Sequence, residues 1–297
     1  MQRALTPARL RILAAAALFS TGGAAIKIAA FNAPQVSALR SGIAAVALLL
    51  WLRGRLNWSG TAVLIGFVYA ATLTLFVGAT KLTTAANAIF LQSTAPLYLL
   101  LLAPFALQER VHRREALYLL AVAAGLLFCF FGQRVATATA PDPRTGNLLG
   151  LACGVAWALT LLGLRWAERG HARPGVGLTA VVAGNATAFL VALPYAWPFP
   201  SAGVVEWSTV TYLGVFQIGL AYIFVTSAMR DLPALDASLL LLLEPVLNPV
   251  WAWAIRGEEP GTWTILGGVV IIAATAIKSV HDAGIVAGGR GALGARE

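Results

Sequence analysis

One acidic residue interrupts a strongly apolar segment of this chain. Glu244 follows five consecutive leucines and comes directly before Pro245. On a helix of 3.6 residues per turn, Glu244 shares one face with Asn248 and Trp251. A carboxylate and an amide on one face of an apolar helix can bind an ammonium group, carry a proton, or hold a neighbouring donor in place. The choice among these depends on the medium that surrounds the helix.

Three interpretations of Glu244 are open. It recognises a positively charged ammonium group of a solute, it binds a proton, or it is a structural partner of a donor such as Lys27 or Arg40. The structural interpretation is favoured, because Pro245 frees a carbonyl one turn back and kinks the helix, so that its neighbours need hydrogen-bond partners.

Further polar and aromatic residues fall inside apolar segments and are candidates for the wall of a binding cavity. Aromatic walls suit amphipathic solutes, and Tyr and Trp add one polar group each. For any one of these residues, packing against a neighbouring helix or anchoring at the membrane interface is the alternative explanation. As a set near the middle of several segments, they favour a cavity. They are Ser20, Tyr69, Gln92, Ser93, Tyr98, Trp157, Gln217, Tyr222 and Asn248.

The segments that position these residues are long and apolar. Of the 297 residues, 59% are hydrophobic and 11% are charged, whereas a soluble domain has about 45–50% and about 25%. The composition predicts an all-α integral membrane protein, since runs of this length fit helices and not barrel strands. We expect ten transmembrane helices, each bounded to within a few residues, at 10–29, 36–52, 60–80, 85–107, 115–132, 147–167, 175–195, 207–228, 235–256 and 261–280.

The net charge of +9 follows the topology of the spans. With the N-terminus inside, 15 of the 21 Lys and Arg residues fall on the cytoplasmic side, so both termini are predicted to be cytoplasmic. The excess of basic over acidic residues is therefore explained by membrane topology, and no nucleic-acid partner is expected. The first span is expected to be a transmembrane helix and not a cleaved signal peptide. The remaining six bases lie on the opposite side or near that end of the spans: Lys27, Arg40, Lys81, Arg134, Arg144 and Arg256.

The chain contains an internal repeat. An offset of 149 aligns Pro96 and Glu109 with Pro245 and Glu258, and an offset of 138 aligns Phe19 and Lys27 with Trp157 and Arg165. Each unit has five helices, which is an odd number, so the second unit begins on the opposite side of the membrane and is inverted relative to the first. We predict one transmembrane domain over 1–281, with repeat one at about 8–134 and repeat two at about 146–281, followed by a disordered cytoplasmic tail over 282–297. Two inverted five-helix repeats are the architecture of secondary transporters.

At the level of motifs, the second half resembles a known family. The Leu-Glu-Pro at 243–245, the Arg-Gly-Glu-Glu at 256–259 and the Gly-Gly at 267–268 are similar to EamA-type members of the drug/metabolite transporter superfamily. Trp157 followed by Arg165 is also similar to the first-helix pattern of that family, whereas Phe19 departs from the tryptophan usual in the first half. The resemblance implies ten helices, inverted halves and export of small metabolites, often amino acids, from bacteria. By the same resemblance, Tyr69, Trp157 and Tyr222 match aromatic positions of amino-acid exporters.

The function predicted is a secondary transporter of the bacterial inner membrane that exports small metabolites, above all amino acids including aromatic ones, by alternating access around a midplane cavity. The predicted substrate site comprises Tyr69, Trp157, Tyr222, Gln92, Ser93, Glu244, Asn248, Ser20 and Tyr98. Export of other metabolites or drugs is the alternative, and a channel or an intramembrane enzyme represents a different class.

Sequence motifs argue against the enzyme. No HExxH motif occurs, the three histidines fall in predicted loops, and the two cysteines, Cys129 and Cys153, provide neither a disulfide framework nor a metal cluster. No cofactor, metal or nucleotide site is expected. The expected partners are a small-molecule solute and the lipid bilayer. Proton coupling, facilitated diffusion, a monomer and a homodimer all remain open.

Overall fold

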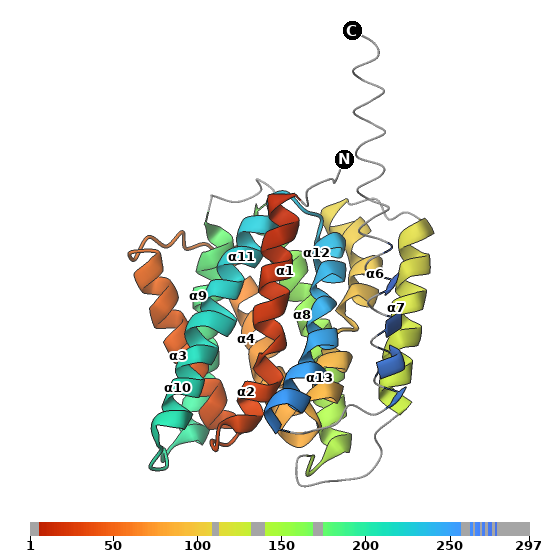
Figure 1. Ribbon diagram of the computed structural model, residues 1–297. Coiled ribbons are helices and arrows are strands. Elements are labelled where there is room, and N and C mark those ends of the chain that lie inside the picture. Colours follow the sequence, from red (N-terminus) through yellow and green to blue (C-terminus); the bar gives the residue numbers. More distant parts are fainter. Residues whose placement is uncertain are drawn as a thin grey trace.

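The protein is built from helices that run side by side (Figure 1). The computed structural model describes residues 6–108, 113–131, 140–168 and 175–256, with 262–263, 265–267, 269–270, 273–274 and 277 near the end of the chain. These residues contain no β-strand, and eight helical stretches are long and apolar enough to cross a membrane. The elements are α1 (Pro7–Ser20), α2 (Gly22–Ile28), α3 (Ala33–Trp51), α4 (Gly60–Leu82), α5 (Ala85–Gln92), α6 (Ala95–Leu107), α7 (Arg113–Phe131), α8 (Pro143–Trp166), α9 (Val176–Ala196), α10 (Val204–Tyr212), the π-helix η2 (Leu213–Leu220), α11 (Ala221–Ala228), α12 (Ala234–Leu241) and α13 (Leu243–Arg256).

The eight stretches coincide with eight of the ten predicted spans, namely the first four and the sixth to the ninth. The fifth predicted span, 115–132, coincides with helix α7, which is not among the eight. The tenth, 261–280, lies largely outside the described residues, and so do the tail, Glu109, Glu258 and the three histidines. The protein is thus an all-helical membrane protein, and the number of ten helices stays a prediction.

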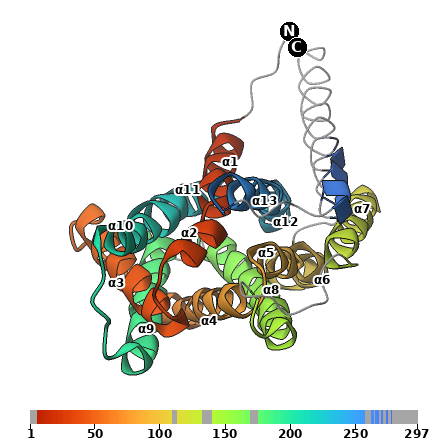
Figure 2. The same ribbon diagram turned by 60° about the horizontal axis from the view of Figure 1, so that its bottom comes forward.

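The helices form a closed ring (Figure 2). Going round it, α1 packs on α11, the adjoining η2 packs on α3, and α3 packs on α9. The ring continues as α9 on α4, α4 on α8, α8 on α5, α5 on α13, and α13 on α1. Each neighbour in this sequence comes from the other half of the chain, so the halves alternate around the ring. Helix α7 lies outside it, against α5 and α6.

Two of the spans are broken at the prolines that the repeat aligns. Proline has no N–H, so Pro96 cannot donate to the carbonyl of Gln92, and Pro245 cannot donate to that of Leu241. Helix α5 ends at Gln92 and helix α12 ends at Leu241. The bounds of α5 and α12 differ by 149 at both ends, which is the offset of the repeat. The helix is thus broken beside Pro245, where a kink was expected, and it is broken in the same way beside Pro96.

Helix starts are fixed by side-chain caps that are readable in the sequence. Asn32 forms a capping box with Gln35 at the start of α3, and Asp142 accepts a hydrogen bond from the Thr145 backbone N–H, at 3.1 Å, at the start of α8. Asp142 lies outside the spans, and donation from the Thr145 hydroxyl and backbone N–H holds the pKa of its carboxyl below its ordinary value.

Candidate functional site

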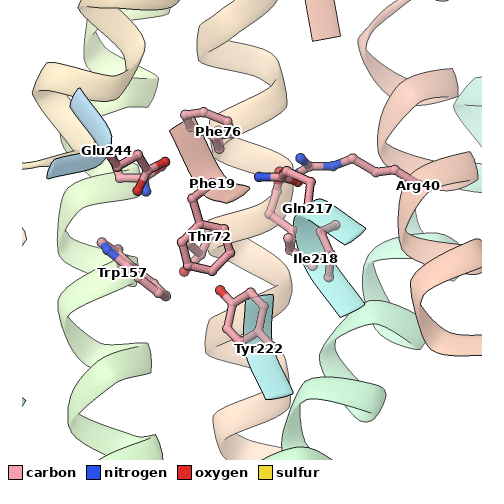
Figure 3. Close-up of a pocket in the computed structure, with 11 residues that line it drawn as sticks. Phe19, Arg40, Thr72, Phe76, Trp157, Gln217, Ile218, Tyr222 and Glu244 are labelled. Carbon is pink, nitrogen blue, oxygen red and sulfur yellow. The ribbon is translucent and has the colours of Figure 1, made fainter. Parts of the chain in front are cut away.

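A cavity lies in the centre of the helix ring, and we call it the central cavity (Figure 3). Its volume is about 30 Å³, enough for about two water molecules. Both halves of the chain contribute to its wall. The lining residues are Phe19, Arg40, Thr72, Leu73, Phe76, Gln92, Trp157, Gln217, Ile218, Tyr222 and Glu244.

Aromatic rings form one part of the wall. Tyr222 lies at the centre of this group, with ring centroids 5.3 Å from Phe19, 6.1 Å from Trp157 and 4.6 Å from Tyr69. Phe19 and Trp157, which the repeat aligns, meet edge to face at 6.2 Å. Edge-to-face pairs at these separations are favourable, so the cluster holds its shape without filling the cavity. The π-helix η2 and the start of α11 supply Gln217, Ile218 and Tyr222 to this side; π-helical turns occur often at functional sites.

The carboxyl group of Glu244 faces the central cavity from α13 (Figure 3). A second, smaller cavity of about 10 Å³ also touches Glu244, together with Gln92, Ser93 and Trp157. Glu244 is 5% exposed and forms no hydrogen bond or ion pair with any described residue. The interpretation of Glu244 as a structural partner is therefore not supported, because Lys27 donates to the Thr83 carbonyl and Arg40 to the Leu73 carbonyl instead.

Arg40 brings a second charge to the central cavity, from α3. Its side chain is 1% exposed, its Nη2 donates to the carbonyl of Leu73 at 3.1 Å, and its guanidinium lies 6.0 Å from the ring centroid of Phe76. Its Nε has no hydrogen-bond partner among the described residues. In Figure 3, Arg40 and Glu244 approach the cavity from opposite sides. The cavity therefore has one basic and one acidic wall.

The predicted site residues separate into two groups. Gln92, Trp157, Tyr222 and Glu244 line the central cavity, and Ser93 lines the second one. Gln92 also accepts a hydrogen bond from the thiol of Cys153 at 3.4 Å. The other four predicted residues, Ser20, Tyr69, Tyr98 and Asn248, line neither cavity.

Ser20 and Asn248 take part in hydrogen bonds at the break between α1 and α2. Asn248 donates from Nδ2 to the Ser20 carbonyl at 3.1 Å, and Trp251 donates to the Ser20 hydroxyl at 2.9 Å. Close contact here requires glycine, because a Cβ on Gly22 would lie 2.7 Å from Nε2 of Gln217 and one on Gly23 would lie 2.6 Å from Nδ2 of Asn248. These contacts hold α13 and η2 against the break.

Tyr69 and Tyr98 lie outside both cavities for different reasons. Tyr69 is 1% exposed and packs behind Tyr222, so it supports the aromatic wall without forming its surface. Tyr98 is half-buried on α6 and packs against the apolar core. From the sequence alone, Tyr69 and Tyr98 could not be distinguished from Tyr222, which does line the central cavity.

The sequence did not identify several lining residues as part of the site. Thr72, Phe76 and Ile218 are types that occur throughout apolar helices, so no sequence signal marks them, whereas Phe19 was marked only by its alignment with Trp157. Arg40 did carry a signal, because a base within a span costs at least about 2.5–3.5 kcal/mol at the bilayer centre. It was placed near the end of its span, whereas the structure buries it on the wall of the cavity.

Two basic side chains bind backbone carbonyls at helix C-termini. Near the end of α2, Lys27 Nζ donates at 2.9 Å to the carbonyl of Thr83, the C-cap residue of α4; this is the Lys27 latch. Near the end of α8, Arg165 Nη1 donates to the carbonyl of Met229, the C-cap residue of α11, and at 3.0 Å to that of Arg230; this is the Arg165 latch. Carbonyls at helix C-termini carry partial negative charge, which favours a cation there.

The two latches lie at opposite ends of the ring. The backbone N–H of Asp142, directly before α8, donates to the carbonyl of Leu82 at the end of α4, which places the start of α8 beside the Lys27 latch. At 1.5 Å per residue, Arg165 lies about 33 Å farther along α8 from Pro143. Lys27 and Arg165 are the pair that the repeat aligns at an offset of 138.

Comparisons with known proteins agree with this architecture. The chain is 26% identical over 265 residues to the Pseudopaline exporter CntI of Pseudomonas aeruginosa, covering 86% of this chain and 90% of that protein. It is 22% identical over 255 residues to the uncharacterized transporter YyaM of Bacillus subtilis, covering 82% and 83%. One solved crystal structure matches with a TM-score of 0.73 and 20% identity, covering 93% of this chain and 98% of the other, which shows a shared fold.

A family model gives the assignment directly. The model of the EamA-like transporter family matches residues 7–131 and 144–280, which together make up most of the chain. Its members are transporters and not enzymes, in keeping with a multi-pass membrane protein whose apolar helices surround a cavity. The chain therefore belongs to the EamA-like transporter family.

Proposed function

We propose that this protein is a secondary exporter of amino acids, including aromatic ones, that works by alternating access. The observation that carries the proposal is the central cavity, which both halves of the chain line, with an aligned basic side chain bound to a C-cap carbonyl at each end of the ring. A solute bound there reaches one face when the Lys27 latch opens and the other face when the Arg165 latch opens.

The proposed architecture is two inverted five-helix repeats within one transmembrane domain. Three observations support it. The family model matches the chain in two stretches of similar length. The order of helices around the ring is symmetric: when each helix is replaced by the helix that the repeat aligns with it, the same neighbours result, read in the opposite direction around the ring. The aligned residues Lys27 and Arg165 bind C-cap carbonyls at opposite ends. Inverted repeats of this kind can exchange packings and so expose one site to either side.

The cavity in the present conformation is too small for an amino acid, so the proposal requires movement. A volume of about 30 Å³ compares with ligand pockets of about 300 Å³ or more. The small cavity and the two bound latches support the assignment of this conformation to a closed intermediate. Binding of a solute would separate the ring helices around the aromatic wall.

The substrate class follows from the wall of the cavity. Phe19, Trp157 and Tyr222 offer flat apolar surfaces to an aromatic or amphipathic side chain. Arg40 and Glu244 offer opposite charges. One relative is named as an exporter of pseudopaline, which supports outward transport of a small metabolite. We place the protein in the bacterial inner membrane with both termini in the cytoplasm, as the distribution of Lys and Arg predicts.

Uptake into proteoliposomes tests the proposal. Labelled amino acids, including phenylalanine, tyrosine and tryptophan, are supplied with and without a pH gradient, and protein-free liposomes are the control. Saturable uptake with counterflow is expected for at least one of them, whereas flux that does not saturate would indicate a channel. Stimulation by the gradient would identify proton exchange, and equal rates would identify facilitated diffusion. Transport of nucleotide sugars or cationic drugs, with no response to any amino acid, would overturn the substrate assignment.

A further inference from the structure

The central cavity contains one basic and one acidic side chain, and they come from different halves of the chain. Arg40 is on α3 and Glu244 is on α13, which are not neighbours in the helix ring. Both side chains are almost completely buried, at 1% and 5% exposure. Figure 3 shows them on opposite sides of the cavity.

Neither charge is neutralised by an ion pair with a described residue. The ion pair between Arg230 and Glu168, at 2.8 Å, involves neither Arg40 nor Glu244. Glu244 accepts no hydrogen bond there, and Arg40 donates to one backbone carbonyl, that of Leu73, while its Nε has no partner. Buried charges in proteins are normally paired or hydrogen-bonded, because an unpaired buried charge is costly. The arrangement therefore points to a ligand that supplies the missing partners.

The ligand that fits must carry both charges. A carboxylate can accept two hydrogen bonds from a guanidinium, and an ammonium can donate to a carboxylate. A solute with only one of these groups would leave either Arg40 or Glu244 unpaired. The rings of Phe19, Trp157 and Tyr222 line the space beside the two charges and would contact the rest of the solute.

We infer that Arg40 binds the carboxylate of the amino-acid substrate and that Glu244 binds its ammonium group. The inference rests on the proposed function and specifies the orientation of the solute in that site. Arg40 and Glu244 then act as specificity-determining residues, and they exclude solutes of a single charge because the opposite wall stays unpaired.

Competition against uptake of labelled L-phenylalanine tests this orientation in proteoliposomes that contain the full chain. The competitors are L-phenylalanine, L-phenylalaninamide, which keeps only the ammonium, and N-acetyl-L-phenylalanine, which keeps only the carboxylate. For the unchanged protein, each singly charged analogue should compete about 10-fold or more weakly than L-phenylalanine, as expected for loss of one charge-assisted hydrogen bond.

The two substitutions should change selectivity in opposite ways. In Glu244→Gln, N-acetyl-L-phenylalanine should compete as well as L-phenylalanine, whereas discrimination against the amide should persist. In Arg40→Gln, L-phenylalaninamide should compete as well as L-phenylalanine, whereas discrimination against the acetyl derivative should persist. Arg40→Lys keeps the charge and should keep the original order. Asp142→Asn and Arg55→Gln, at exposed positions far from the cavity, are the matched controls and should change nothing.

Binding provides a second measurement if a variant does not transport. Stabilisation of the purified protein against thermal unfolding by each compound gives the same ranking without flux. If both variants lose binding of all three compounds to the same extent, the inference is overturned. If Glu244→Gln instead accepts the amide and Arg40→Gln accepts the acetyl derivative, the assigned orientation is overturned. In both cases the proposed function would stand, provided that the unchanged protein transports L-phenylalanine. Absence of amino-acid transport by the unchanged protein would instead remove the proposed function, and the inference with it.

Discussion

Replacing Lys27 with methionine should open the central cavity toward the end of the ring at which Lys27 lies. The substitution keeps an apolar side chain of similar length and removes the donor to the Thr83 carbonyl. A hydrogen bond to a charged group contributes about 1.5–3 kcal/mol, which corresponds to a change of about 10-fold to 150-fold in the ratio of closed to open states. The lower value applies here, because Lys81 Nζ still donates to the Ala29 carbonyl at 2.9 Å in the same region.

The thiol of Cys153 can report this opening. Cys153 is fully buried and donates to Gln92, which lines the central cavity. In a chain with Cys129→Ser, a membrane-impermeant thiol reagent is applied to right-side-out and inside-out vesicles. Lys27→Met should increase the rate of modification about 10-fold from the Lys27 end only. Arg165→Met should increase it from the opposite end only, because the proposed function assigns the closing of that end to the Arg165 latch.

Two results would refute the assignment of the latches. One is an unchanged rate of Cys153 modification from both ends in the Lys27→Met and Arg165→Met proteins. The other is faster modification of Lys27→Met from the end that Arg165 closes. Lys27→Arg keeps a cationic donor and serves as the control, so its rate should stay close to that of the unchanged protein.

Three further predictions concern packing, the aromatic wall and a helix cap. Gly23→Val should lower the free energy of unfolding by about 1–3 kcal/mol, since its Cβ would lie 2.6 Å from Nδ2 of Asn248; thermal unfolding in detergent measures this. Trp157→Ala should raise KM for L-phenylalanine about 2-fold to 10-fold through loss of an aromatic contact, as measured by uptake. Asp142→Ala should lower Tm at pH 7 by removing the acceptor for Thr145, and the difference should vanish in acid.

The sign of the pH effect follows from the lowered pKa of Asp142. Its ionised form stabilises the folded state fully above its unfolded pKa of about 3.9, and this contribution is lost as the pH falls through the lower folded pKa. Asp142→Asn keeps a capping side chain and should stay close to the original Tm at pH 7. An Asp142→Ala deficit that is the same at pH 7 and in acid would contradict the assignment.

The other two predictions have controls in the chain. A Cβ on Gly60 would meet nothing within 4 Å, so Gly60→Val should leave stability nearly unchanged. Tyr98→Ala removes a half-buried ring that lines neither cavity, and it should leave KM unaltered. Tyr69→Ala should lower transport through displacement of Tyr222. An equal effect of Trp157→Ala and Tyr98→Ala on KM would show that the cavity wall is assigned wrongly.

The helix breaks were predictable because they depend on local chemistry. Apolar length gives the position of a span, and a missing N–H at Pro96 and Pro245 frees the carbonyls of Gln92 and Leu241 wherever the helix lies. The observed ends of α5 and α12 at these two residues agree with that expectation. Composition and local sequence also determined that this is a membrane protein, that it is helical, and that Glu244 has an unusual position.

The tertiary structure decided which polar residues face the cavity. Glu244 and Asn248 lie one turn apart on one helix face, yet Glu244 faces the cavity whereas Asn248 binds the Ser20 carbonyl, 228 positions away in the chain. Arg40 and Glu244 meet the same space only because the halves alternate around the ring. Hydropathy and periodicity fix the depth and face of a residue within its own helix. The rotation of each helix and the neighbour it meets are set by contacts between distant segments, so the pairing of a basic and an acidic wall exists only in the folded protein.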